Sequence, residues 1–404
     1  EPSTPMADEI LCFLIKQGVS KKRAFLIAAC CALAIKLFLF FYAELYAPQA
    51  KFQTDTSMYV ESGMSLVSHG VFARPDSAGN FIPEIFRTPG YPLFLGVFHG
   101  IMRIPFTGII LIQIALTIFV AFITYKIALS INPQLGYLST LIVLFDPPIT
   151  ILSLMLLTES LFLLCITLLV LMFIRYLKEG RIKFLVFSAV LAAAATYVRP
   201  VNYFLGAGMG FFLLYLFIRT KQKKLILHAF IFLIVVYSLI GIWHVRNYRV
   251  AGRNTFTTWT DFGSTYRKFY ARKDDVITRG LPPIPYYLNA VSRCVVSLMT
   301  EPGTLKDFNR GTLKRIEKIL GYLWVAFWMV GFLVSIFRMR NNLYLQFLLY
   351  IIGFFVCVSI AGILFAVGYR LRVPMVACLA VLSAHGWMRI AAGIKAAKQA
   401  APST

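Results

Sequence analysis

Seven short polar stretches interrupt an otherwise strongly apolar chain, and they hold the residues that could do chemistry. They are Asp55, Arg87 in RTPGYP (87–92), Asp146-Pro147-Pro148, Glu159, Arg199-Pro200, Arg246-Asn247, and Arg370 with Arg372. An arginine stays charged when buried and matches phosphate oxygens through paired hydrogen bonds. A carboxylate can take a proton from an attacking hydroxyl within hydrogen-bond reach. Together these groups suit transfer away from a lipid phosphate, with arginines holding the leaving phosphate and an aspartate activating the acceptor.

The composition places these residues in a membrane protein. The chain has 404 residues, of which 59% are hydrophobic and only 14% are charged, and its mean hydropathy is +0.75. Soluble globular proteins have about 45–50% apolar and about 25% charged residues. The net charge of +23 lies largely in short loops beside apolar runs, as cytoplasmic loops of membrane proteins do. These properties exclude ordinary soluble, disordered and disulfide-stabilised classes and disfavour nucleic acid as a partner.

The apolar runs predict ten membrane-spanning helices, since about 20 apolar residues cross the bilayer core. They lie at 24–43, 106–125, 135–146, 155–174, 184–198, 201–218, 225–243, 319–337, 343–367 and 373–391. Compact basic stretches such as Arg175–Lys183 and Arg219–Lys224 alternate with the spans, which predicts that both termini are cytoplasmic. Residues 1–5, before Met6, are interpreted as a leftover of expression.

Two large loops, 47–105 and 246–318, face the other side together with three tight turns. Every polar stretch named above falls on that face or within about two helical turns of it. Random placement would divide such residues between the two faces. Because ionisable residues at membrane depth are functional by default, the asymmetry predicts one site at the external end of the bundle. In the first loop, Gly90 to Arg103 is predicted to be a short interfacial helix, since it is too short to span.

The same residues resemble a known enzyme family. Asp55 with Tyr59 four residues on, followed by Arg87–Pro92, is similar to the first external loop of GT-C glycosyltransferases. So are Asp146-Pro147, Thr158-Glu159, Arg199-Pro200, Arg246-Asn247-Tyr248 and the turn Arg370–Pro374. The relatives that this order suggests are the family-39 mannosyltransferase-like bacterial enzymes and the aminoarabinose transferase of lipid A. The resemblance covers nearly the whole chain.

The resemblance implies an all-α polytopic membrane protein, with a GT-C-like bundle of about ten transmembrane helices forming a single domain, 6–404. The loops 47–105 (catalytic, with interfacial helices) and 246–318 would form two periplasmic subdomains. The implied activity is inverting transfer of a hexosyl or pentosyl group from a polyprenyl-phosphate donor, such as an undecaprenyl phosphate sugar. The acceptor would be a hydroxyl of a glycolipid, glycan or protein at the periplasmic face of a bacterial inner membrane. We expect a monomer surrounded by membrane lipids.

The resemblance also implies roles for particular residues. Asp55, Asp146 and Glu159 would be catalytic, and Arg87, Arg199, Arg246, Arg370 and Arg372 would bind the donor phosphate. Tyr59, Tyr91, Asn247 and Tyr248 would contact substrate or lipid. Simpler interpretations exist for some of these residues. Asp55 could be a solvated acid or a partner of Lys51, Arg87 could anchor lipid headgroups, and Asp146 could cap a helix that begins with proline.

The sequence gives little indication of a cofactor. The family often doubles the first-loop acid, but here Thr56 follows Asp55, so a divalent metal is possible but not indicated. The five histidines show no metal-ligand spacing, and a Gly-rich nucleotide loop is absent from the sequence. Two other functions remain open: a flippase or transporter of lipid-linked sugars, and an O-antigen ligase or polymerase. The one-sided charges disfavour the first, and the prominent Asp55–Arg87 loop disfavours the second.

Overall fold

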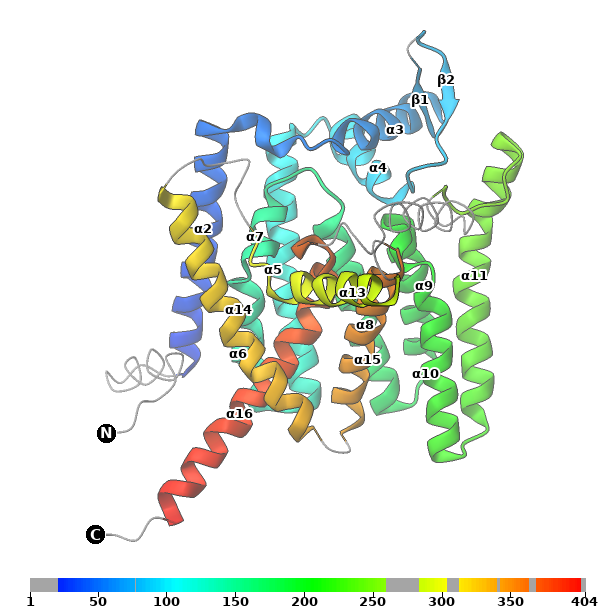
Figure 1. The fold of residues 1–404 in the computed structure, drawn as a ribbon. Coiled ribbons are helices and arrows are strands. Elements are labelled where there is room, and N and C mark those ends of the chain that lie inside the picture. Colours follow the sequence, from blue (N-terminus) through cyan, green and yellow to red (C-terminus); the bar gives the residue numbers. More distant parts are fainter. Residues whose placement is uncertain are drawn as a thin grey trace.

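The protein is a bundle of long apolar helices with the first loop lying across one end (Figure 1). The computed structural model describes residues 21–76, 78–258, 283–303, 312–339, 342–362 and 368–400, so residues 1–5 lie outside it. Eight described helices are long and apolar enough to span a membrane. They are α2 (Lys21–Tyr46), α5 (Phe106–Ile131), α8 (Glu159–Glu179), α10 (Leu205–Thr220), α11 (Lys224–Ala251), α14 (Thr312–Arg338), α15 (Leu343–Gly362) and α16 (Val376–Ala400). The prediction of a polytopic all-α membrane fold is confirmed.

The two short predicted spans differ from the rest. The run 135–146 does not continue straight, because α6 (Gly136–Leu144) and α7 (Pro147–Ser153) meet at a bend of 50°. Pro147 cannot continue the hydrogen-bond ladder of α6, and the Asp146 side chain accepts from the Ile149 N–H at 3.0 Å, which starts α7. The other run is α9 (Ile182–Val198), a 17-residue helix packed against α8 and α11. The predicted count of ten thus corresponds to eight long helices, a broken pair and α9.

The first loop is compact and folded. It contains the short helices η1 (Pro48–Lys51) and α3 (Thr56–His69), and a hairpin of β1 (Ala73–Pro75) and β2 (Phe81–Pro83). Then α4 (Gly90–Leu95) runs directly into η2 (Gly96–Ile101). The predicted helix from Gly90 is therefore present and ends at Ile101. Glycines bring α3 and the α4–η2 helix close together, because a Cβ on Gly96 would lie only 2.7 Å from the Gly63 carbonyl oxygen.

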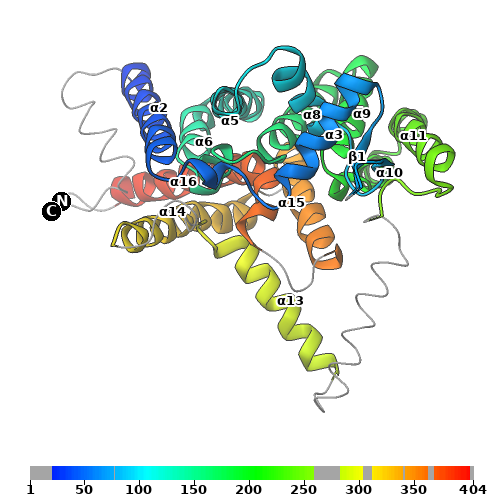
Figure 2. The same cartoon turned by 90° about the horizontal axis from the view of Figure 1, so that it is seen from above.

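The described parts of the region 246–318 are mainly helical. Helix α11 continues to Ala251 and ends at Gly252, whose φ of 63° suits a residue without a side chain. Helix α13 (Pro283–Thr300) follows, and α14 begins at Thr312. Figures 1 and 2 show α13 lying across the bundle and extending away from it. Residues 259–282 and 304–311 of this region lie outside the described residues.

The end of the chain returns to the bundle through two short turns, η5 (Tyr369–Leu371) and η6 (Val373–Met375), which lead into α16. Helix α16 packs closely on α14, because Gly386 and Gly331 face each other without side chains between them. The start of α2 and the end of α16 lie at the same end of the bundle, and the first loop lies at the other (Figure 1).

Candidate active site

Six predicted site residues meet where the first loop covers the bundle. We call them the arginine–carboxylate cluster: Asp55, Tyr59, Arg87, Glu159, Arg199 and Arg370. They come from the start of α3, the turn before α4, the start of α8, the end of α9 and η5. Three arginines against two carboxylates give the cluster one excess positive charge.

Asp55 and Arg87 form a direct ion pair in the outer half of the cluster. The Arg87 Nη2 atom lies 2.6 Å from Asp55 Oδ1, and the side chains are 17% and 29% exposed. Asp55 precedes α3 but makes no side-chain capping bond to it, so its carboxylate faces the cluster instead. Arg87 also donates to the Tyr59 hydroxyl at 3.3 Å. Lys51, the alternative partner for Asp55, is instead paired with Glu44 at 2.7 Å.

Glu159 holds the other two arginines together in the inner half. Its Oε1 atom lies 2.7 Å from Arg370 Nε and 2.9 Å from Arg199 Nη1. The Glu159 side chain is 1% exposed, whereas Arg370 is 39% exposed. A buried carboxylate stays ionised only when cations compensate its lost hydration, and two arginines do so here. Glu159 is therefore arranged to position cations.

Tyr59 connects the two halves. It lies within electrostatic range of Arg87, Glu159, Arg199 and Asp55, and Arg370 in turn lies within range of Asp55. Burial raises the pKa of Tyr59, with Arg87 opposing the shift, so the phenol stays protonated and can donate a hydrogen bond. Its ring packs edge-on against the fully buried Tyr91, whose hydroxyl donates to Gln113 at 2.7 Å. Tyr91 thus supports Tyr59 from behind.

Glu84 is a site residue that the sequence interpretation missed. This buried carboxylate accepts from the backbone N–H groups of Phe86 and Arg87, at 2.5 and 2.9 Å, and pairs with Arg74. It therefore shapes the turn that presents Arg87. The available signal was an acid three residues before Arg87 in an otherwise apolar and proline-bounded stretch, which is typical of a side chain that bonds a local turn.

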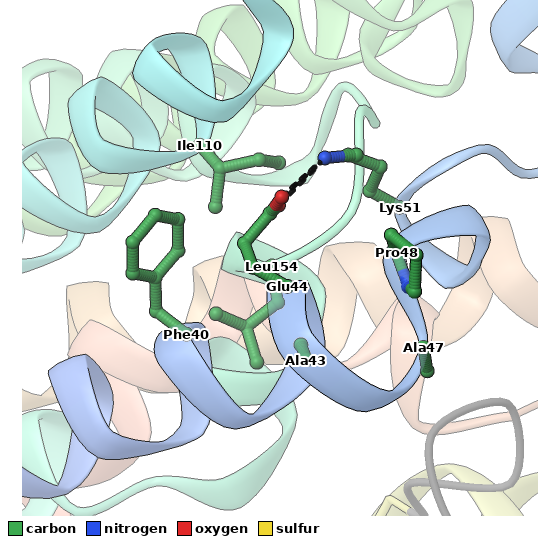
Figure 3. A pocket seen from close by; sticks show the side chains of 8 residues that line it. All are labelled: Phe40, Ala43, Glu44, Ala47, Pro48, Lys51, Ile110 and Leu154. Atoms are coloured by element: carbon green, nitrogen blue, oxygen red, sulfur yellow. Dashed lines mark hydrogen bonds and ion pairs between the residues drawn. The ribbon is translucent and has the colours of Figure 1, made fainter.

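Backbone contacts fix the two halves relative to each other. The Leu156 N–H donates to the Lys51 carbonyl at 2.9 Å, and the Thr56 hydroxyl donates to the Leu156 carbonyl at 3.1 Å. The loop before Asp55 is thereby attached to the segment before Glu159. Beside it, a small hollow between α2 and α5 is lined in part by the Glu44–Lys51 pair (Figure 3). Leu154 lines that hollow, and none of its lining residues belongs to the cluster.

Arg246, Asn247 and Tyr248 lie outside the cluster. Arg246 donates to the backbone carbonyls of Glu84 and Phe72, at 2.6 and 2.5 Å, and so connects α11 to the first loop. Asn247 is fully buried and donates to the carbonyls of residues 255 and 256, which closes the end of α11. Tyr248 is 63% exposed. The first two thus support the site through the backbone.

Asp146 and Arg372 form a second, buried group. Both are almost fully buried, and Asp146 lies within electrostatic range of Arg372 and of Lys36. Lys36 donates to the Thr150 hydroxyl at 2.7 Å, and that hydroxyl donates to the Asp146 carbonyl. Neither Asp146 nor Arg372 contacts the cluster directly through a described ion pair. Among the described residues, no group of three or more His, Cys, Asp or Glu side chains is arranged to hold a metal ion.

Comparisons with known proteins support the fold. Residues 86–243 match the family model described as dolichyl-phosphate-mannose-protein mannosyltransferase. Across 95% of its length the chain matches the archaeal oligosaccharyltransferase AglB from Archaeoglobus fulgidus, in complex with an inhibitory peptide and a dolichol-phosphate. The TM-score is 0.53 at 12% identity, and 52% of that chain is covered. A second structure of the Archaeoglobus fulgidus oligosaccharyltransferase, with Zn and sulfate, gives 0.53 at 14% identity over 92% of this chain and 49% of that one.

A match to ArnT from Cupriavidus metallidurans covers 92% of this chain and 79% of that one, at 12% identity. Its TM-score of 0.40 is too low to establish a common fold. None of the curated proteins compared with the chain matches it in sequence. The chain spans about half the length of the oligosaccharyltransferases. The predicted resemblance is confirmed: residues 86–243 are similar in sequence to the mannosyltransferase family, and the chain is a polytopic membrane protein with the fold of the oligosaccharyltransferase AglB.

Proposed function

We propose that the protein is an inverting glycosyltransferase that moves a sugar from a polyprenyl phosphate to a hydroxyl acceptor. The reaction would take place at the periplasmic face of a bacterial inner membrane. The observation that supports this most directly is the arrangement of Asp55 beside Arg87, in one cluster with Arg199 and Arg370. That cluster lies at the end of the bundle opposite the start of α2 and the end of α16. The short basic stretches predicted to be cytoplasmic support the same orientation.

In the proposed reaction the acceptor oxygen attacks the anomeric carbon while the bond from that carbon to the phosphate oxygen breaks. The acceptor proton passes to the Asp55 carboxylate, and the leaving polyprenyl phosphate keeps the electron pair. Arg87, Arg199 and Arg370 stabilise the charge that develops on the phosphate. Glu159 orients two of these arginines and takes no proton, because its carboxylate is buried between them. Since attack and departure occur on opposite faces, a single displacement inverts the anomeric carbon.

A polyprenyl donor suits the position of the cluster. It lies at the ends of apolar helices, where a phosphate can meet cations while its hydrocarbon chain remains among lipids. One of the matched oligosaccharyltransferase structures holds a dolichol-phosphate, a molecule of the same chemical class. The acceptor would be a glycolipid, glycan or protein hydroxyl.

The test uses the purified protein in liposomes with a panel of radiolabelled undecaprenyl phosphate sugars and a membrane extract as acceptor source. We expect transfer of label from at least one donor, with opposite anomeric configuration in the product, and loss of transfer in the Asp55→Asn variant. Equal label transfer by the wild type and this variant would contradict the proposal. Retention of the donor's configuration would contradict the single displacement.

A further inference from the structure

We propose that Arg372 is a positioning residue that holds Arg370 against Glu159, so that α13 sets the geometry of the phosphate-binding arginines. Both arginines lie in the turn Gly368–Arg372, which we call the arginine turn. Its consequence for donor binding rests on the proposed function. Within the arginine turn, Arg370 belongs to the arginine–carboxylate cluster, whereas Arg372 belongs to the buried group that contains Asp146.

Arg372 is anchored to the end of α13. Its Nη1 atom donates to the carbonyls of Leu298 and Met299, at 3.2 and 2.8 Å, in the last turn of that helix. A cation at a helix C-terminus satisfies carbonyls that lack intrahelical partners and interacts favourably with the helix dipole. The guanidinium carbon also lies 5.4 Å from the centre of the Trp328 ring. The residue is 1% exposed, so it cannot reach a ligand at the surface of the cluster.

Opposite charges compensate the buried guanidinium. Asp146, at the bend between α6 and α7, and Glu301, just after α13, both lie within electrostatic range of Arg372. A buried arginine without such partners would be strongly destabilising. The arrangement gives Asp146 a role outside the proposed chemistry, because its charge helps to keep Arg372 in place.

The arginine turn transmits this anchoring over a very short distance. The Leu371 N–H donates to the Gly368 carbonyl and the Arg372 N–H donates to the Tyr369 carbonyl, both at 3.1 Å. One residue separates Arg372 from Arg370, whose Nε atom lies 2.7 Å from Glu159. Because Glu159 also holds Arg199, displacement of the turn would disturb two of the three arginines proposed to bind phosphate.

The experiment combines Arg372→Met and Arg370→Met, singly and together, with Arg389→Met as a matched control. Arg389 lies on α16, after the arginine turn, and donates to His385 on the same helix. Hydrogen exchange of residues 298–303 and 368–375 measures the local order, and the probe for binding is farnesyl phosphate in detergent micelles. Arg372→Lys, which keeps a cation and a donor, provides a folded variant if the methionine variant proves unstable.

We expect Arg372→Met to speed exchange in both segments and to weaken farnesyl phosphate binding about fivefold or more, a change typical of losing a charge-assisted contact. In the Arg370→Met background, the same change should alter binding less than about twofold, because residues acting through one contact are not additive. Arg372→Lys should restore part of the protection, and Arg389→Met should change neither measurement.

Two results would overturn the inference: unchanged exchange in Arg372→Met and Arg372→Lys, or an undiminished effect of Arg372→Met in the Arg370→Met background. The second would mean that Arg372 acts on phosphate independently of Arg370. If the wild type does not bind farnesyl phosphate, the polyprenyl-phosphate donor of the proposed function is contradicted. The exchange measurement still decides whether Arg372 orders the turn, so the two failures can be told apart.

Discussion

At the scale of single residues, the proposed base, Asp55, forms an ion pair with one of the proposed phosphate ligands, Arg87. Asp55 and Arg87 are 2.6 Å apart, and each neutralises the other while both remain partly exposed. A donor phosphate would compete with Asp55 for the Arg87 guanidinium, since phosphate matches the same paired donors. Donor binding would therefore release the Asp55 carboxylate, which makes it available for the acceptor proton only when donor is present.

Replacing Asp55 by asparagine separates these two roles. Asparagine keeps the size of the side chain but cannot take the proton, so turnover should fall at least a hundredfold, within the range of about 10²–10⁴ for general-base catalysis. Binding of farnesyl phosphate should be kept or become tighter, because a competing charge is removed from Arg87. Transfer assays and titration of the probe measure the two effects. Near wild-type turnover would show that Asp55 is not the base.

Replacing Arg87 by alanine should instead weaken the use of donor. A charge-assisted hydrogen bond contributes about 1.5–3 kcal/mol, so donor use at subsaturating concentration should fall more than about tenfold. Arg253→Ala is the matched control, because this arginine is exposed in the segment after α11. The comparison uses initial rates at donor concentrations below saturation. Unchanged rates in Arg87→Ala would remove Arg87 from the phosphate site.

At the scale of helices, the contact between the first loop and α9 sets the spacing of two arginines. The Thr88 hydroxyl donates to the Val198 carbonyl at 3.2 Å, and these residues are the chain neighbours of Arg87 and Arg199. The next glycine permits this approach, since a Cβ on Gly90 would lie 2.7 Å from the Tyr197 carbonyl oxygen. Close backbone packing therefore places guanidinium groups from two separate elements in one site.

We expect Gly90→Ala to disturb this contact. The added methyl would have to displace backbone, and overpacking of this kind costs about 1–3 kcal/mol. Thermal unfolding in detergent should show lower stability, and farnesyl phosphate binding should weaken as Arg87 moves relative to Arg199. Gly393→Ala on α16 is the control, because a Cβ at that position would meet nothing within 4 Å. Equal behaviour of the two variants would mean that the first loop adapts without cost.

At the scale of the whole molecule, the two ends of the bundle differ in the segments that they carry. The first loop and the cluster lie at one end, and the start of α2, the turn between α10 and α11, and the end of α16 lie at the other (Figure 1). In the view from above, α3 of the first loop lies over the part of the bundle that holds α8 and α9 (Figure 2). The cluster therefore lies at the end of the bundle that bears the first loop.

Cysteine labelling of intact cells tests this orientation. A thiol introduced at Ala78, exposed in the first-loop hairpin, should react with a membrane-impermeant maleimide added from outside. A thiol at Gln222, exposed between α10 and α11, should react only after the cytoplasmic membrane is opened. The unmodified chain measures the background from its native cysteines. The reverse pattern would place the cluster in the cytoplasm.

The residue types of the cluster, and their position at one end of the bundle, could be predicted from the sequence, whereas pairing between distant residues could not. Asp55 and Arg87 are 32 residues apart in one loop, so the sequence could predict that they lie close together. Glu159 and Arg370 are 211 residues apart, and nothing in the sequence specifies that their helices meet. Asp146-Pro147-Pro148 indicated a helix start, which is the start of α7, but the apolar run 135–146 was counted as one complete span although α6 and α7 meet there at a bend. Arg246 was predicted to bind the donor phosphate, and the sequence could not show that its guanidinium donates to the carbonyls of Glu84 and Phe72.

The Glu159–Arg370 pair also has a consequence for how the protein is made. During synthesis, Asp55 and Arg87 can meet as soon as the first loop is complete, and Glu159 can meet Arg199 once α9 has been inserted. Arg370 follows only after α15, so every earlier intermediate lacks the third cation. Nascent chains should therefore be unable to hold a donor until the last helices are inserted. Connectivity alone would delay the proposed activity until membrane assembly is nearly complete.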